Sequence, residues 1–295
     1  MKPNLVRATL FDTHVSITFL NTTDLCREGR NIHNTSRTAS AALGRAMTAA
    51  ALLGDSLKED DFRSVLILAG GGPVGRIVAE SNNKVHVRAD IDHPEVDVPA
   101  KENGKLDVGA LVGKDGYLRV LKDIGLKEPY IGTVDLVSGE IAEDLTAYYF
   151  YSEQIPTAAA LGVLVAQDGT ILSAGGFLGQ LLPGHTEEHI EFLENLAQKF
   201  AGGISRVLVD TPDVYEMLRI AAGDHPYEIV SEKEVRYHCP CNVHKIESII
   251  LSMGREEIEN LIAEGGAEIQ CHYCKKAYGF SPDSLRQLLD IQAKL

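Results

Sequence analysis

The chain lacks the features that mark membrane, exported and nucleic-acid-binding proteins. No apolar run approaches the roughly 20 residues that cross a bilayer. Asp12, Thr13 and His14 interrupt the N-terminal stretch, so it offers no continuous signal-peptide core. Basic residues are few: 28 lysines and arginines stand against 42 acids, a net charge of −14, and none form a cluster with interleaved aromatics. Because nucleic-acid backbones bind cationic surfaces, we expect no nucleic-acid partner. Because the chain has no membrane span and no signal-peptide core, we expect no membrane partner and a cytoplasmic location.

Signatures of enzymes are missing as well. No serine, histidine and aspartate occur at a spacing that indicates nucleophilic catalysis. The glycine-rich segment Gly70–Gly75 lacks the Lys-Ser/Thr of a phosphate loop and leads into a strand-like segment, so we predict a tight turn. A second polar cluster predicts a turn, with a metal site as the alternative, and consists of Asp90, Asp92, His93 and Glu95. We therefore expect a protein that is not an enzyme and uses no nucleotide.

Cysteine is scarce, but its placement is highly informative. Four of the five cysteines lie in the last fifth of the chain: Cys239 and Cys241 form a C-x-C pair, Cys271 and Cys274 a C-x-x-C pair, and residues 242–270 separate the pairs. Two close pairs on separate turns can place four sulfurs about 2.3 Å from one zinc ion. We therefore predict one zinc ion per monomer on these four residues. Cys26 stands alone and is predicted to be a small buried hydrophobic residue.

Other interpretations of the cysteines stay open at this point. The pairs could be structural disulfides, and a neighbouring His238, His244 or His272 could replace one sulfur. The zinc could be purely structural, or it could belong to a redox switch. Zinc keeps its sulfur ligands as thiolates, the form that oxidants attack, and each pair is close enough to form its own disulfide, a strained one in the C-x-C case.

The pattern of hydrophobic residues predicts an α+β fold that begins with a sheet-and-helix core domain over 1–184. Residues 4–20 alternate like a strand, and an alanine-rich helix with N-cap residues is expected over 34–55. Residues 62–180 are mostly strand-like, with a helix over 139–153 and a hairpin that turns at Gln167–Thr170.

Two smaller parts are expected after the core. A helical linker covers 185–234, and its first helix has an apolar stripe that needs another surface to cover it: Ile190, Leu193, Leu196 and Phe200. A zinc-binding domain covers 235–295, with helices near 243–253 and 255–264, a strand-turn-strand carrying CHYC, and a final helix from Pro282. About 60 residues are marginal on core burial alone, so we expect zinc to be needed for folding.

Taken together, these motifs resemble the heat-shock protein 33 family of redox-regulated chaperones. The resemblance extends over essentially the whole chain. It rests on RTASAALGRAMTAAALLG, GGGPVGRIVAES, GGFLGQLLPG and the C-x-C and C-x-x-C pairs at Cys239, Cys241, Cys271 and Cys274. It implies a zinc-bound, inactive reduced protein. Oxidants such as hypochlorous acid, or peroxide combined with heat, would then form Cys239–Cys241 and Cys271–Cys274 disulfides, with zinc release and unfolding of the C-terminal domain and linker.

The resemblance also implies the partners. Unfolding client proteins would be held without ATP to prevent their aggregation, and we allow for a homodimer in the activated state. Two other functions remain as alternatives. A zinc-ribbon nucleic-acid module is disfavoured by the charge of −14. A thiol-disulfide oxidoreductase is disfavoured because no thioredoxin-like β-α-β pattern surrounds CHYC.

Overall fold

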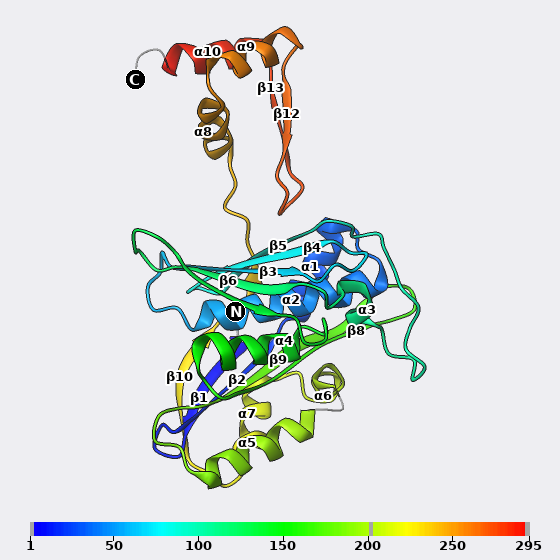
Figure 1. Ribbon diagram of the computed structural model, residues 1–295, viewed down its shortest axis with the longest axis vertical. Helices are drawn as coiled ribbons and strands as arrows, with labels where there is room; N and C mark the ends of the chain where they lie inside the picture. Colours follow the sequence, from blue (N-terminus) through cyan, green and yellow to red (C-terminus); the bar gives the residue numbers. More distant parts are fainter. Residues whose placement is uncertain (1–2, 201–202, 293–295) are drawn as a thin grey trace. The chain divides into compact units, whose positions relative to one another are not determined.

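The structure is a computed structural model that describes residues 3–200 and 203–292 (Figure 1). Residues 1–2, 201–202 and 293–295, which our predicted domain bounds include, lie outside the described residues. The chain forms two compact units, one ending at His238 and one beginning at Cys239. Among the described residues, no helix combines the length and the apolarity needed to cross a membrane.

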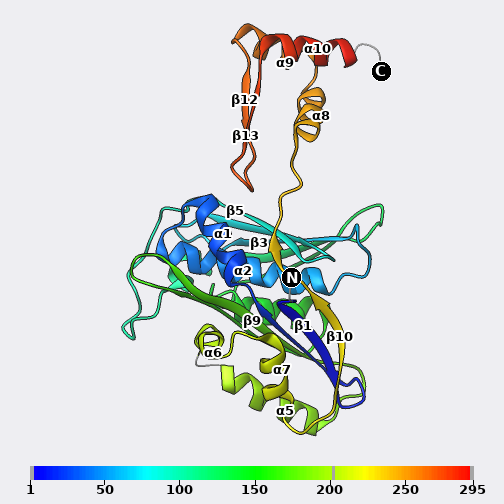
Figure 2. The same ribbon diagram turned by 180° about the vertical axis from the view of Figure 1, so that it is seen from behind.

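The first unit contains a five-stranded antiparallel sheet whose strands come from both ends of the unit. The strand order is β10-β1-β2-β9-β8. Figure 2 shows β10 running beside β1. The strands are β1 (Leu5–Leu10), β2 (Val15–Asn21), β8 (Thr157–Val165), β9 (Ile171–Leu181) and β10 (Tyr227–Lys233).

The N-terminal hairpin corrects the prediction of a single strand over 4–20. Phe11, Asp12 and Thr13 have φ angles of 52°, 51° and 75°, and the backbone N–H of His14 donates to the carbonyl of Phe11 at 3.0 Å. The chain therefore reverses between β1 and β2. The turn contains neither glycine nor proline, so the usual residue signal for a reversal is missing from the sequence.

A second, six-stranded sheet has the order β11-β5-β4-β3-β6-β7, in which only β11 is parallel to its neighbour β5. The predicted glycine-rich turn joins β3 to β4. Gly72 is required there, because a Cβ atom would lie 2.4 Å from the carbonyl oxygen of Leu111. The strands are β3 (Arg63–Ala69), β4 (Arg76–Asn82), β5 (His86–Ile91), β6 (Tyr117–Asp123), β7 (Tyr130–Asp135) and β11 (Arg236–Tyr237).

The alanine-rich helix α2 (Arg37–Asp55) lies between the two sheets, as Figure 1 shows, and confirms the helix predicted over 34–55. Ser36 caps it by accepting a hydrogen bond from the Ala39 N–H at 3.2 Å. Small residues let both sheets approach closely, and almost the whole helix is buried. The other helices here are α1 (Thr23–His33), α3 (Val108–Val112), α4 (Ala142–Tyr148) and the π-helical turn η1 (Tyr149–Glu153), the last two covering the predicted helix over 139–153.

Three helices cover the other face of the five-stranded sheet: α5 (Glu187–Phe200), α6 (Ile204–Asp210) and α7 (Val214–Ala222). The apolar stripe of α5 packs on this face as predicted. The ring of Phe200 lies 5.2 Å from that of Phe177, and Leu193 packs over Gly179, which has no side chain to hinder it.

The end of the predicted linker differs from the all-helical expectation for 185–234. Residues 227–233 form β10, which adds to the free side of β1. Tyr237, which we placed in the zinc-binding domain, lies in β11 and is buried in the first unit. Its hydroxyl donates to the Ala89 carbonyl at 3.2 Å. The first unit therefore continues to the residue before Cys239.

The second unit has a small core of its own and the order of elements that the sequence predicts. Its elements are α8 (Val243–Met253), α9 (Arg255–Ala263), β12 (Ala267–Gln270), β13 (Ala277–Phe280) and α10 (Pro282–Gln292). Eight buried residues form the core: Ile246, Ile250, Ile258, Tyr278, Phe280, Leu285, Leu288 and Leu289.

Candidate metal centre

Two turns of the second unit present the four cysteines. Cys239 and Cys241 lie on either side of Pro240, just before α8, whose first turn is capped by Asn242. Cys271 and Cys274 lie in the turn between β12 and β13. This turn is closed at both ends, because the Lys275 N–H donates to the Cys271 carbonyl at 2.8 Å and the Cys271 N–H donates to the Lys276 carbonyl at 2.9 Å.

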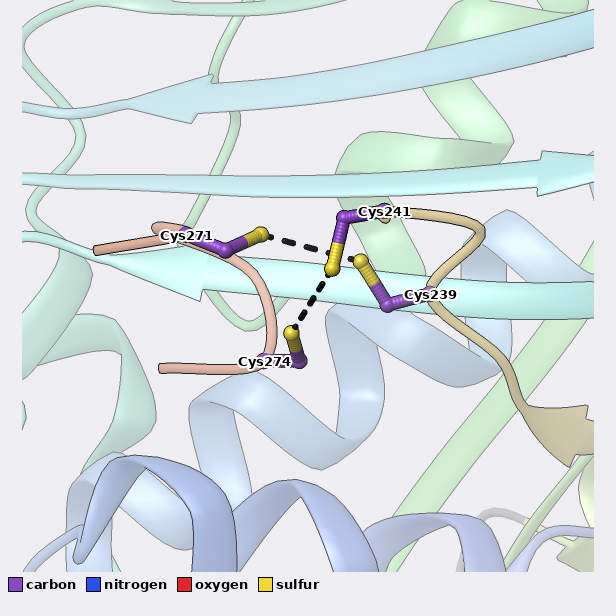
Figure 3. Close-up of side chains that lie close together, drawn as sticks. All are labelled: Cys239, Cys241, Cys271 and Cys274. Carbon is purple, nitrogen blue, oxygen red and sulfur yellow. Dashed lines mark hydrogen bonds between the residues drawn. The ribbon is translucent and has the colours of Figure 1, made fainter. Parts of the chain in front are cut away.

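The four sulfurs converge on one point (Figure 3). All four Sγ atoms lie within 4.8 Å of one another. The Sγ atoms of Cys239 and Cys271 are 3.7 Å apart, and those of Cys241 and Cys274 are 3.3 Å apart. A tetrahedral zinc site with Zn–S bonds of about 2.3 Å has sulfur-sulfur edges of about 3.8 Å. The cluster therefore has the ligand type, number and spacing of a four-thiolate zinc site.

The surroundings of these sulfurs shift the pKa values of Cys241 and Cys274 in opposite directions. The Tyr278 hydroxyl donates to Sγ of Cys241 at 3.1 Å. Burial raises the pKa of Cys241, but hydrogen bonds from Tyr278 and from the other cysteines outweigh it and lower that pKa to about 7. Burial and the bonds that its own thiol makes to the other sulfurs raise the pKa of Cys274 to about 12. The Tyr278 hydroxyl therefore favours the thiolate form of Cys241, which is the form of cysteine that binds metals.

Two neighbouring basic residues have contacts with other side chains. Lys276 Nζ lies 5.1 Å from the centre of the Tyr278 ring, and His244 Nδ1 lies 3.0 Å from a carboxylate oxygen of Glu247. Within 3–200 and 203–292, the four cysteines are the one place where three or more histidine, cysteine or acidic ligand atoms converge. The alternative in which a histidine replaces a sulfur is therefore not supported.

Two other features singled out from the sequence, the polar cluster that includes Asp92 and the lone Cys26, make contacts that give them a structural role. Asp92 accepts hydrogen bonds from the backbone and side chain of Arg76 at 2.9 and 3.3 Å, as expected for a polar turn. Cys26 is buried in the first unit, and its thiol lies 3.7 Å from Thr22 Oγ1. Burial raises the pKa of Cys26 to about 12, so this cysteine is protonated and unreactive, as predicted.

Tyr278 is the residue of the site that sequence reasoning missed. A signal was present: it lies on the strand that leaves the CHYC turn, four residues after Cys274. A strand so close to the turn must place one of its side chains beside the sulfurs. Cysteine spacing alone could not identify which residue would donate to them.

Comparison with known proteins places these features in a wider group. Residues 4–281 match the Hsp33 protein family. The 33 kDa chaperonin of Bacillus subtilis is 44% identical over 287 residues, which cover 97% of this chain and 98% of the relative. That of Thermoanaerobacter pseudethanolicus is 40% identical over 292 residues, 99% of each chain. The crystal structure of the 33 kDa chaperonin (heat shock protein 33 homolog) of Thermotoga maritima superimposes with a TM-score of 0.89 over 100% of both chains at 36% identity.

Proposed function

The chain belongs to the Hsp33 protein family, and we propose that it is a redox-regulated chaperone that holds unfolding proteins without ATP. Relatives that match it over nearly their full length are named as chaperonins. The convergence of four sulfurs in the second unit is the observation that carries the redox part of the proposal. We place this activity in the cytoplasm, where free thiols persist.

In the reduced state, Cys239, Cys241, Cys271 and Cys274 would hold one zinc ion. Bound zinc keeps all four sulfurs as thiolates and cross-links the two turns of the second unit. The side chains contribute in different ways: Cys241 offers its sulfur as a thiolate near neutral pH, and Tyr278 stabilises that charge through its hydroxyl.

Oxidation would join Cys239 to Cys241 and Cys271 to Cys274. Each bond would form as two thiolates give up two electrons to an oxidant such as hypochlorous acid or peroxide, and zinc would leave as the ion. The sulfurs in a disulfide no longer serve as thiolate ligands, so the two turns lose the link between them. Among the described residues of the second unit, the eight-residue core is then the hydrophobic cluster left to keep it folded.

Unfolding would reach the first unit through the two strands that precede Cys239. β11 has two residues, and β10 lies at the border of its sheet with Tyr227, Ile229 and Val230 exposed. β10 is held by Asp55, which is 2% exposed; Lys233 Nζ lies 2.9 Å away and Ser231 Oγ donates to it at 2.7 Å. Arg7 of β1 contacts the same carboxylate at 3.2 Å.

Release of α5, α6 and α7 along with β10 would uncover a large apolar face. The inner side chains of β1 and β2 are fully or almost fully buried beneath these helices, and they are Val6, Ala8, Leu10, Val15, Ile17 and Phe19. An apolar face of this kind binds exposed hydrophobic segments of other proteins. We propose it as the client-binding surface.

An aggregation assay with the same protein in two redox states tests this function. Light scattering of a heat-unfolding client should be suppressed by the oxidised chain and much less by the reduced, zinc-loaded chain, without ATP in either case. Dithiothreitol with zinc should reverse the effect. Equal suppression by both states would leave a chaperone without a redox switch.

Peptide mapping tests the disulfide pairing separately. Trypsin places Cys239 and Cys241 on the peptide 237–245, and Cys271 and Cys274 on 256–275. Disulfides within each pair leave the two peptides separate, each lighter by two hydrogens. The short sulfur contacts in the structure run between the pairs, so cross-linked peptides are the outcome that would contradict the proposed pairing.

A further inference from the structure

The first unit has a second concave site, unrelated to the cysteines, at the border of the five-stranded sheet. It is a cavity of about 190 Å³ lined by α2, the loop 103–106, the beginning of α6 and β8. β8 is the last strand in its sheet, and residues 161–165 of it line the cavity in one continuous run. Figure 1 shows β8 with α2 on one side and α6 on the other.

The charge of this cavity is opposite to that of the chain. Its lining includes four basic side chains and no carboxylate: Arg37, Arg45, Lys105 and Arg206. Acids outnumber bases by 42 to 28 in the sequence, so four bases without an acid run against the composition. Like charges repel when they converge, and such a group is stable only when solvent or a bound anion screens it.

Two of the four bases are held in place by the fold. Arg37 donates from Nε to the Ala166 carbonyl at 3.0 Å. Arg45 donates from Nη1 to the Glu140 carbonyl at 3.1 Å and also to its carboxylate. These contacts fix the two guanidinium groups along one side of α2. Binding a ligand there would cost little side-chain entropy, because the groups are already ordered.

The remaining charge is largely uncompensated. Glu140 is shared between Arg45 and Lys101, so one carboxylate faces two cations. In the part of the chain that the structure describes, no carboxylate lies within 4 Å of the charged atoms of Arg37, Lys105 or Arg206. The Nε of Arg45 is buried without a hydrogen-bond acceptor. The site therefore has a surplus of positive charge and of N–H donors.

The size of the cavity decides what class of anion fits. Pockets for drug-sized molecules occupy roughly 300–1,000 Å³, and a bound peptide strand needs a longer groove. At about 190 Å³ the cavity suits a compact anion. The fork of an arginine matches two oxygens of a phosphate, and several cations together favour a multivalent ligand. We propose that this cavity binds a small multivalent oxyanion of the phosphate class.

The experiment is a calorimetric titration of the full, reduced, zinc-loaded chain with sodium tripolyphosphate. Parallel titrations with ATP without magnesium and with inorganic phosphate distinguish an inorganic chain from the phosphate tail of a nucleotide. We expect saturable binding that weakens as salt is raised. Lys105→Glu and Arg206→Glu should each weaken it at least tenfold, and Lys105→Arg should retain it.

Lys127→Glu is the matched control, because Lys127 is exposed on the loop between β6 and β7 and its reversal changes the net charge equally. It should change the affinity less than twofold. The proposal is overturned if the unmodified chain shows no saturable binding, or if all three reversals weaken binding alike. It is overturned equally if neither Lys105→Glu nor Arg206→Glu matters, since tripolyphosphate would then be acting elsewhere, for example on the zinc. The outcome is independent of the redox proposal, because the cavity lies wholly in the first unit.

Discussion

The two units of this protein use different means to stay folded. In the first, α2 is buried between two sheets and a second hydrophobic cluster fills the space beneath α5, α6 and α7. In the second, the described residues provide a core of eight buried side chains and four converging sulfurs. Small domains bury too little apolar surface to be secure without a metal or disulfides. From this difference we expect sensitivity to metal and oxidant to begin in the second unit.

Removal of zinc is the strongest test of this difference. A chelator that strips the metal from the reduced chain should abolish amide-exchange protection across 243–292 while α2 and β9 remain protected. Structural zinc is worth roughly 10–16 kcal/mol in small finger peptides, more than this core can replace. Retained protection in α8 and α10 without metal would show that the second unit is stable on its own.

Replacing single cysteines should show the same difference between the units, this time in zinc binding. Cys271→Ser should reduce zinc binding sharply, measured as bound metal per monomer after gel filtration, because it removes one of four ligands. Cys26→Ser should leave the stoichiometry unchanged, since Cys26 lies in the other unit. One full zinc per monomer in Cys271→Ser would contradict the four-sulfur site.

A truncation in the stripe of α5 should loosen one of the helices that we propose are released on oxidation. Leu193 is 5% exposed, and Leu193→Ala should destabilise the docked helix by about 2–5 kcal/mol. Hydrogen exchange over 187–200 should accelerate, and some client holding should appear without oxidant. Glu194→Ala, an exposed neighbour on the same helix, is the control and should do neither. If the two variants behaved alike, the packing of α5 would not be part of the switch.

Asp55→Asn should have a smaller, local effect. The carboxylate is buried, but its partners Lys233 and Arg7 are 22% and 31% exposed, so we expect a loss of about 2 kcal/mol, below the 3–5 kcal/mol of fully buried pairs. Exchange should accelerate in β10 more than in β9. The exposed pair of Arg219 and Glu216 is the comparison, and Arg219→Ala should cost less than about 1 kcal/mol. A uniform effect on all strands would show that Asp55 does not act on β10 in particular.

The smallest effect that we predict is that of acid on the stability of the first unit. Burial opposes ionisation of Glu140, but Lys101 and Arg45 outweigh it and hold its pKa below the ordinary value. The folded state therefore binds fewer protons. This stabilisation is present above the ordinary pKa of a glutamate, about 4.3, and is lost as pH falls from there through the lowered pKa of Glu140. Thermal unfolding followed from pH 6 to 3 should show Glu140→Gln losing less stability with acid than the unmodified chain. If stability fell equally with pH in the two proteins, Glu140 would not contribute to the acid dependence.

The sequence predicted best what depends on neighbours along the chain. The spacing of Cys239, Cys241, Cys271 and Cys274 identified the cluster, capping residues located α2, and Pro282 marked the start of α10. Contacts between distant residues were missed. β10 pairs with β1, and β11 with β5, across most of the first unit, and neither short strand has a pattern that names its partner. The reversal at Phe11–Thr13 was missed because residues that rarely adopt positive φ form it.

The pairing of Leu5 with Lys233 has a consequence for synthesis on the ribosome. At roughly 5–20 residues per second, about 10 to 45 seconds separate the emergence of the first strand from that of the strand that completes its sheet. Until then one side of β1 has free backbone groups, and such an edge pairs readily with another chain. The nascent protein is therefore open, for that interval, to the same association that we propose the finished protein prevents in others.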